Sequence, residues 1–210
     1  MNRLPVKVQE VLKNENIISL RPAQEKALNA GLLDRKNLLI CTPTASGKTL
    51  VAEIAFNNNK KSIYIVPLIA LASEKYKSFK KKYPHLKIAL SIGDLDRADP
   101  YLSEYDVIVC TAEKLDSLLR HKVSWIHEVD CVIIDEIHLL NDVSRGPTLE
   151  LLITLLKRLK IQLIGLSATI GNSKELAEWL NAELIIDTWR PVTLHKGVYY
   201  DGLIEYVEEN

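Results

Sequence analysis

Two short segments of this chain carry residue types that together can bind and split a nucleoside triphosphate. The first is Thr42-Pro-Thr-Ala-Ser-Gly-Lys-Thr49 and the second is Asp135-Glu-Ile-His138. In the first segment, backbone N–H groups and a helix N-terminus can face phosphate oxygens. In the second, two acids directly follow a four-residue apolar run, where carboxylates are costly without a cation. The two segments therefore predict a phosphate cradle beside an acidic metal site, with ATP and Mg²⁺ as cofactors.

The residues of the first segment have separate expected roles. Gly47 lets the backbone approach the phosphates, Lys48 neutralises the β- and γ-phosphates, and the Thr49 hydroxyl is a Mg²⁺ ligand. Thr42 stands where the general P-loop pattern has its first Gly, and a chance Gly-Lys-Thr turn is the alternative interpretation. The remaining nucleotide-binding residues of the loop are Thr44, Ala45 and Ser46.

The acidic pair supplies the other half of the expected chemistry. Asp135 holds the Mg²⁺, and Glu136 orients and deprotonates the water that attacks the γ-phosphate. The catalytic set is therefore Lys48, Asp135 and Glu136. An ordinary Asp at a helix N-cap is the alternative for this position.

Short apolar runs and amphipathic segments alternate along the chain, and they must position these residues. Strands are expected at 37–41, 62–66, 87–91, 107–110, 131–134, 162–166 and 184–186. Pro22 suits the first turn of one helix and Gly31 its C-terminal cap, and another helix starts at Pro147. This alternation predicts an α/β fold with a parallel sheet covered on both faces. A RecA-like P-loop three-layer sandwich with a mostly parallel central sheet is the expected architecture.

Further motifs stand in a fixed order around the two segments. They are Leu20-Arg-Pro-Ala-Gln24, Val66-Pro-Leu-Ile-Ala-Leu71, Thr111-Ala-Glu-Lys114, Asp116-Ser-Leu-Leu-Arg120, Arg145-Gly-Pro-Thr-Leu-Glu150, Leu166-Ser-Ala-Thr-Ile-Gly-Asn172 and Trp189-Arg-Pro-Val192. With the P-loop and Asp-Glu-Ile-His, this set resembles the superfamily-two helicases of the Ski type. It is most similar to the archaeal HELQ-related DNA repair helicases, and the resemblance runs from about residue 20 to about residue 198.

The resemblance implies a motor that uses ATP to move along single-stranded DNA and to unwind forks in the 3′-to-5′ direction, in DNA repair and stalled-fork processing. Such enzymes need a second RecA-like motor domain and accessory domains, whose motifs are absent from these 210 residues. We therefore expect 1–198 to be the first motor domain and 199–210 to be the truncated start of the connection to the second. The isolated chain is expected to be nearly inactive as an ATPase and to act as a monomer.

The same resemblance assigns roles outside the ATP site. Gln24 reads adenine, although by spacing alone it is a solvated helix residue. The residues that couple ATP to the nucleic-acid strand are His138, Ser167 and Thr169, with helix capping or a structural histidine as alternatives. The residues that contact nucleic acid are Pro67, Thr111, Glu113, Lys114, Arg120 and Arg145. For Arg145, a contact with the second domain or a helix cap stays open.

Composition fits an intracellular globular protein. The chain has 27 basic and 27 acidic residues, 47% hydrophobic residues and no apolar run that approaches a membrane span. Three cysteines without metal-like spacing indicate reduced thiols in the cytoplasm, where a nucleoid-associated enzyme works. A lysine run over 75–87 is more typical of a solvated helix face than of a phosphate contact. Trp125, Trp179 and Trp189 are expected in the core.

Two other functions stay open at this point. A Ski-type RNA helicase has much the same motor motifs, because the strand is gripped by its backbone. A non-catalytic nucleotide-binding module that regulates assembly is the alternative from another class. Intact Lys48, Asp135 and Glu136 argue against that module.

Overall fold

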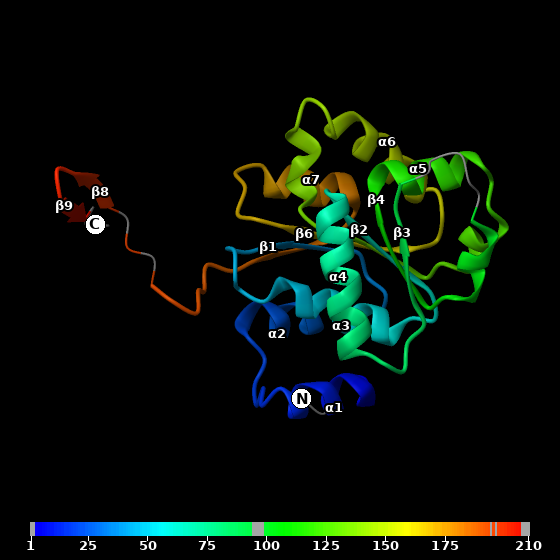
Figure 1. Cartoon of the computed structure of the whole chain (residues 1–210), viewed down its shortest axis with the longest axis horizontal. Coiled ribbons are helices and arrows are strands. Elements are labelled where there is room, and N and C mark those ends of the chain that lie inside the picture. The colour runs from blue at the N-terminus through cyan, green and yellow to red at the C-terminus, as the bar shows by residue number, and fades with distance from the viewer. Residues whose placement is uncertain (1–2, 94–98, 194, 196, 207–210) are drawn as a thin grey trace.

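A seven-stranded parallel sheet forms the centre of the molecule in this computed structural model (Figure 1). The structure describes residues 3–93, 99–193, 195 and 197–206. The strand order is β3-β4-β2-β5-β6-β1-β7, and every neighbouring pair is parallel. Parallel neighbours need crossover connections, so helices come to lie on both faces of the sheet.

The strands are short and apolar because the sheet is buried on both faces. Every residue of the five inner strands is buried, whereas only Ile185 is buried in β7 at the edge. The strands are β1 (Leu38–Cys41), β2 (Ser62–Val66), β3 (Ile88–Ser91), β4 (Val107–Thr111), β5 (Cys131–Ile134), β6 (Gln162–Ser167) and β7 (Glu183–Ile186). Each predicted strand boundary agrees with these bounds to within one residue, and the parallel sheet is confirmed.

The helices form two layers, and each layer packs on its own face of the sheet. One core contains residues of α1 (Val6–Asn14), α2 (Pro22–Asn29), α3 (Lys48–Asn58) and α4 (Ile69–Lys82). The other contains residues of α5 (Ala112–Arg120), α6 (Gly146–Leu156) and α7 (Ser173–Leu180), and of the 3₁₀ helices η1 (Pro100–Glu104), η2 (Ser124–Glu128) and η3 (Ile137–Asn141). Strand β1 shows the division, because Leu38 and Ile40 belong to the first core and Leu39 and Cys41 to the second. The expected three-layer α/β sandwich is confirmed.

The helix ends follow the punctuation in the sequence. Pro22 occupies the first turn of α2, where its missing N–H costs nothing. Gly31 follows the C-cap with φ +99°, a left-handed conformation that glycine adopts easily. Helix α6 begins at Gly146, one residue before the predicted start. A Cβ at Gly146 would lie 2.3 Å from the carbonyl oxygen of Leu140, so this close approach requires glycine.

Helix α1 is held against the body of the domain through a lysine of α4. Lys82 Nζ lies 2.9 Å from Glu15 Oε2 beyond the end of α1 and 2.8 Å from the buried Glu53 Oε2 of α3. Tyr83 Oη also donates to Glu53, at 2.7 Å. Lys82 is therefore a packing residue, whereas Lys77, Lys80 and Lys81 are exposed as expected for a solvated face.

A β-hairpin near the C-terminal end lies apart from the sandwich in Figure 1. Its strands β8 (Gly197–Tyr200) and β9 (Leu203–Tyr206) are antiparallel and exposed. They are joined by Asp201 and Gly202, both with positive φ, as a tight hairpin turn requires. Residues 199–206, which were expected to begin the connection to a second motor domain, lie in this hairpin. The domain boundary that was predicted after Val198 falls inside β8. The end of the first motor domain stays a prediction about the longer polypeptide.

Within the described ranges, no helix combines the length and the apolar character needed to cross a lipid bilayer. The cores that line the two faces of the sheet account for most of the apolar helix residues. The carboxyl ends of β1, β5 and β6 carry the loops in which the chemistry-bearing motifs lie.

Candidate ATP and metal site

The P-loop connects β1 to α3, as the sequence predicts. Gly47 is the N-cap of α3 and has φ +88°, and a Cβ there would lie 2.7 Å from Gln24 Nε2. Ala45 also has positive φ, at 63°, which is strained for a residue with a side chain. The loop backbone thus contains two left-handed positions, and the Ser46 N–H donates to the carbonyl of Pro43 at 3.3 Å.

Thr42 explains why the first glycine of the general pattern can be missing. Its φ is outside the left-handed region, so a Cβ costs nothing there. Its hydroxyl lies 2.7 Å from Ser46 Oγ and links the two ends of the loop. Its backbone N–H donates to the carbonyl of Ser167 at 3.2 Å, which ties the loop to the end of β6.

Lys48 and Glu136 form an ion pair across the centre of the site. Lys48 Nζ lies 3.1 Å from Glu136 Oε1 and 3.3 Å from Oε2. The lysine side chain is 11% exposed and the glutamate 30%. Glu136 adopts φ 53° at the N-cap of η3, a strained backbone of the kind that recurs at functional sites. The cation expected at the phosphates and the expected base thus neutralise each other.

Asp135 is held from several sides. Tyr64 Oη donates to Asp135 Oδ2 at 2.7 Å, and the Glu136 N–H donates to Oδ1 at 3.1 Å. Burial, and then the neighbouring Asp135 carboxylate, raises the pKa of Tyr64 well above its ordinary value, so this hydroxyl stays a donor. The carboxylate is consequently fixed at the end of β5 with one oxygen turned toward the P-loop side.

The oxygens of Thr49 and Asp135 fit a shared divalent cation. Lys75 Nζ lies 3.3 Å from Thr49 Oγ1 and 3.9 Å from Asp135 Oδ2, so both oxygens face one cationic group. Hydroxyl and carboxylate oxygens are ligands that Mg²⁺ prefers. No group of three or more His, Cys, Asp or Glu side chains in the described ranges is placed to hold a metal. Two protein oxygens, completed by water and phosphate, match the usual coordination of Mg²⁺ at nucleotides.

Gln24 is buried directly beneath the P-loop rather than solvated. Its Oε1 accepts the N–H of Arg21 at 2.8 Å, and its Nε2 donates to the carbonyl of Gly47 at 2.9 Å. Both ends of the amide therefore have partners within the chain. Adenine recognition by Gln24 stays a prediction, and it requires the amide to exchange one of these partners.

Trp189 was expected in the core, and that expectation is wrong. Trp125 is buried, but Trp189 is 39% exposed after the end of β7. The Arg21 guanidinium lies 5.2 Å from its ring centroid and also donates to the carbonyl of Ala45 in the P-loop at 2.6 Å. Arg21 thus contacts both the exposed Trp189 ring and the backbone of the phosphate loop. Sequence reasoning missed it because β7 is an edge strand.

The three residues expected to couple ATP to the strand lie in different settings. His138 Nδ1 is 3.4 Å from Glu136 Oε2, and Ser167 is fully buried at the end of β6. Thr169 is exposed two residues further on. Capping of the next helix is excluded for both hydroxyls, because α7 begins at Ser173 with Asn172 at its N-cap.

The residues expected to contact nucleic acid divide into two groups. Pro67, Glu113 and Arg145 line one small hollow that also borders Asp135 and Glu136. The second group belongs to α5 and its N-cap, and comprises Thr111, Lys114 and Arg120. The Thr111 hydroxyl caps the helix. Lys114 is 1% exposed and its Nζ lies 2.8 Å from Asp99 Oδ2, while Arg120 Nε lies 2.8 Å from Asp116 Oδ2. A contact by Lys114 requires its pair to open.

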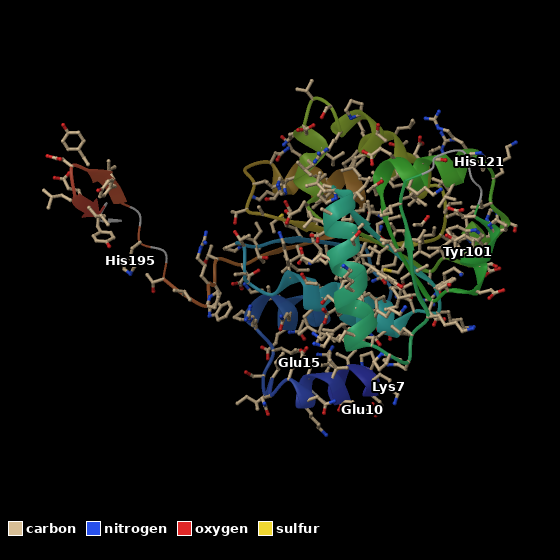
Figure 2. All side chains as sticks on the ribbon, viewed as in Figure 1. Lys7, Glu10, Glu15, Tyr101, His121 and His195 are labelled. Carbon is tan, nitrogen blue, oxygen red and sulfur yellow. The ribbon has the colours of Figure 1, made fainter. Side chains whose placement is uncertain are left out.

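Figure 2 shows side chains filling both layers around the sheet, whereas the hairpin with the nearby His195 stands apart from them. Lys7, Glu10 and Glu15 lie on or just after α1, at the face of the domain remote from α5 and α6 (Figures 1 and 2). The residues of the candidate ATP site come from the sandwich, because Lys48 and Thr49 begin α3 and Asp135 and Glu136 follow β5.

Comparisons with known proteins agree with this site. The family model described as DEAD/DEAH box helicase matches residues 21–177. The ATP-dependent DNA helicase Hel308 of Methanocaldococcus jannaschii is 59% identical over 96% of this chain, and that of Pyrococcus abyssi is 53% identical over 94%. The chain spans 18% and 28% of the lengths of these two relatives. The DNA-bound DUF1998 helicase MrfA has the same fold, with a TM-score of 0.76 and 24% identity over 88% of this chain and 30% of its own.

Proposed function

Because the chain belongs to the DEAD/DEAH box helicase family, we propose that it is the first ATP-binding motor domain of a 3′-to-5′ DNA helicase that acts in repair and stalled-fork processing. The observation that carries this proposal is the Lys48–Glu136 ion pair, with Thr49 and Asp135 facing one cationic group beside it. These are the groups that ATP hydrolysis needs, gathered at one edge of a sheet.

Each of these residues has a distinct task. Lys48 leaves Glu136 and turns to the β- and γ-phosphates when ATP binds, while Thr49 and Asp135 hold Mg²⁺, which would neutralise phosphate charge. Glu136, once released, orients the attacking water and accepts its proton. His138 lies close enough to Glu136 to respond to that exchange, and Ser167 links the P-loop backbone to the next motif.

DNA is the proposed strand because the matched relatives bear the name DNA helicase. Contacts with its phosphates give register without sequence preference. The proposed contacts come from the hollow beside the acidic pair and from the start of α5, once the Lys114–Asp99 pair opens. The strand-contacting residues are Pro67, Thr111, Glu113, Lys114, Arg120 and Arg145.

A second RecA-like motor domain and accessory domains are the proposed partners within the longer polypeptide. The chain spans between 18% and 30% of the relatives it matches. An arginine finger from the second domain is worth roughly 10³–10⁵ in rate, so the 210-residue chain alone should bind ATP weakly, hydrolyse it barely and unwind nothing. We propose a cytoplasmic, nucleoid-associated monomer that loads on single-stranded or forked DNA.

The test is the ATPase rate of the complete polypeptide with single-stranded DNA, with matched RNA, and with neither. DNA-stimulated turnover that the Glu136→Gln variant lacks would support the proposal. Stimulation by RNA alone would assign the domain to an RNA helicase. Turnover that neither strand stimulates would favour a regulatory nucleotide-binding module. Strong DNA-stimulated turnover by the 210-residue chain alone would refute the need for a second domain.

A further inference from the structure

Lys75 of α4 reaches the ATP site from a helix that carries neither the P-loop nor the acidic motif. Its ammonium lies 3.3 Å from Thr49 Oγ1 and 3.9 Å from Asp135 Oδ2. Its side chain is 21% exposed, and that of Asp135 is 9% exposed. The lysine is therefore withdrawn from solvent and turned to the two oxygens proposed to hold Mg²⁺.

The Lys75 ammonium compensates the charge of the Asp135 carboxylate. Asp135 is nearly buried and accepts a hydrogen bond from Tyr64, which stabilises the carboxylate but does not neutralise it. A buried carboxylate without a nearby cation is strongly disfavoured. Lys48 is occupied by Glu136. In the part of the chain that the structure describes, Lys75 is the one cationic side chain within 4.0 Å of the Asp135 carboxylate.

We propose that Lys75 is a positioning residue that takes the place of the metal ion in the metal-free site and competes with Mg²⁺ for Thr49 and Asp135. This inference rests on the proposed function, since it concerns the same ATP site. The Lys75 ammonium lies 3.3 Å from Thr49 Oγ1 and 3.9 Å from Asp135 Oδ2, so a divalent cation bound to both oxygens would take the place of that ammonium. Metal binding therefore requires the Lys75 side chain to move aside, and loss of the metal lets it return.

The competition has two measurable consequences. Without metal, removal of the Lys75 charge leaves Asp135 unpaired and destabilises the fold. With Mg²⁺ present, the same change removes a competitor, so the metal binds at lower concentration. A lysine that contacted phosphate instead would give the opposite result for the metal, because its loss would weaken the metal–nucleotide complex.

The experiment compares wild type with Lys75→Met and with Lys77→Met, a control on the same helix whose side chain is exposed. The first readout is the thermal unfolding midpoint in EDTA and in Mg²⁺ without nucleotide. The second is the Mg²⁺ concentration at which binding of a fluorescent, non-hydrolysable ATP analogue is half-maximal. Lys75→Gln, which keeps a hydrogen-bond donor without the charge, is used if the methionine variant does not fold.

Lys75→Met should melt below wild type in EDTA and gain more from Mg²⁺ than wild type does. Its half-maximal Mg²⁺ concentration should fall by about threefold to tenfold, as expected for loss of a partly buried ion pair. Lys77→Met should match wild type in both readouts. Equal behaviour of the two variants, or a higher Mg²⁺ requirement in Lys75→Met, would overturn the inference. If saturating Mg²⁺ and nucleotide give no binding to wild type, the proposed function fails, and the melting comparison still decides the role of Lys75.

Discussion

Lys48 Nζ lies 3.1 Å from Glu136 Oε1, so the P-loop and the acidic motif are joined by a direct ion pair. The pair bridges two strands, β1 and β5, that are separated in the sheet by β6. It keeps both charged groups compensated in a partly buried place, where a lone charge is unfavourable. In the proposed function, ATP binding would have to break this pair before either residue could act.

Lys48→Met and Glu136→Gln should therefore be coupled in stability. Each single change leaves the other charge without its partner, whereas the double variant removes both charges. The sum of the two single losses should exceed the loss in the double variant by about 1 kcal/mol, measured by denaturant unfolding of all four proteins. Strictly additive losses would show that the ion pair is not formed in solution.

Tyr64→Phe should disturb the metal site as well as the fold. The change removes the 2.7 Å hydrogen bond to Asp135 and should lower the free energy of unfolding by about 1–3 kcal/mol. Because Asp135 loses its orientation, the Mg²⁺ concentration needed for nucleotide binding should rise.

A second buried tyrosine provides the matched control for that measurement. Tyr83 also donates to a carboxylate at 2.7 Å, that of Glu53 in α3, which is not one of the proposed metal ligands. Tyr83→Phe should lose comparable stability and leave the Mg²⁺ requirement unchanged. If the two variants shift the Mg²⁺ requirement equally, Tyr64 has no special link to the metal.

Gly47→Ala should damage the P-loop through its backbone. The residue has φ +88°, and the added Cβ would lie 2.7 Å from Gln24 Nε2 and 3.0 Å from an Arg21 guanidinium nitrogen. We expect a loss of about 1–2 kcal/mol in stability, together with loss of nucleotide binding. Gly171→Ala is the control, since nothing lies within 4 Å of its added Cβ. Wild-type nucleotide affinity in Gly47→Ala would contradict the proposed cradle.

Alkaline pH should destabilise the fold through its buried thiols. Burial raises the pKa of Cys110 from 9.0 to about 12, and burial also raises the pKa of Cys131. The unfolded chain ionises first, so this contribution is complete below pH 9.0 and is lost as the pH rises toward about 12. The slope is about 1.4 kcal/mol per pH unit for each thiol. Unfolding curves of wild type and Cys110→Ala should converge above pH 9.0, and parallel curves would exclude this linkage.

The sheet could be predicted almost completely, because its strands are buried on both faces and therefore appear as uninterrupted apolar runs. The hairpin could not, because its strands are exposed and lack the buried apolar pattern of the sheet strands. The Asp201-Gly202 turn between β-branched and aromatic residues was the available signal.

The candidate site was predictable only where local spacing defines it. The P-loop and the acidic pair each occupy consecutive positions, so their residues could be named from the sequence. Tyr64 and Lys75 could not, because their contacts with Asp135 depend on which strand and helix lie beside β5. Lys114 could be named from its motif, but the motif does not predict that its side chain is buried against Asp99.

In the strand order β5-β6-β1, strand β6 fixes the distance between the loops that follow β1 and β5. Neighbouring strands are about 4.8 Å apart, so the ends of β5 and β1 are held about 10 Å from each other by intact hydrogen-bonded ladders. The distance between β1 and β5 cannot change without breaking backbone hydrogen bonds beside β6. Any rearrangement of the candidate site must therefore come from its side chains and from the loops beyond the strands, because the sheet between them is a rigid frame.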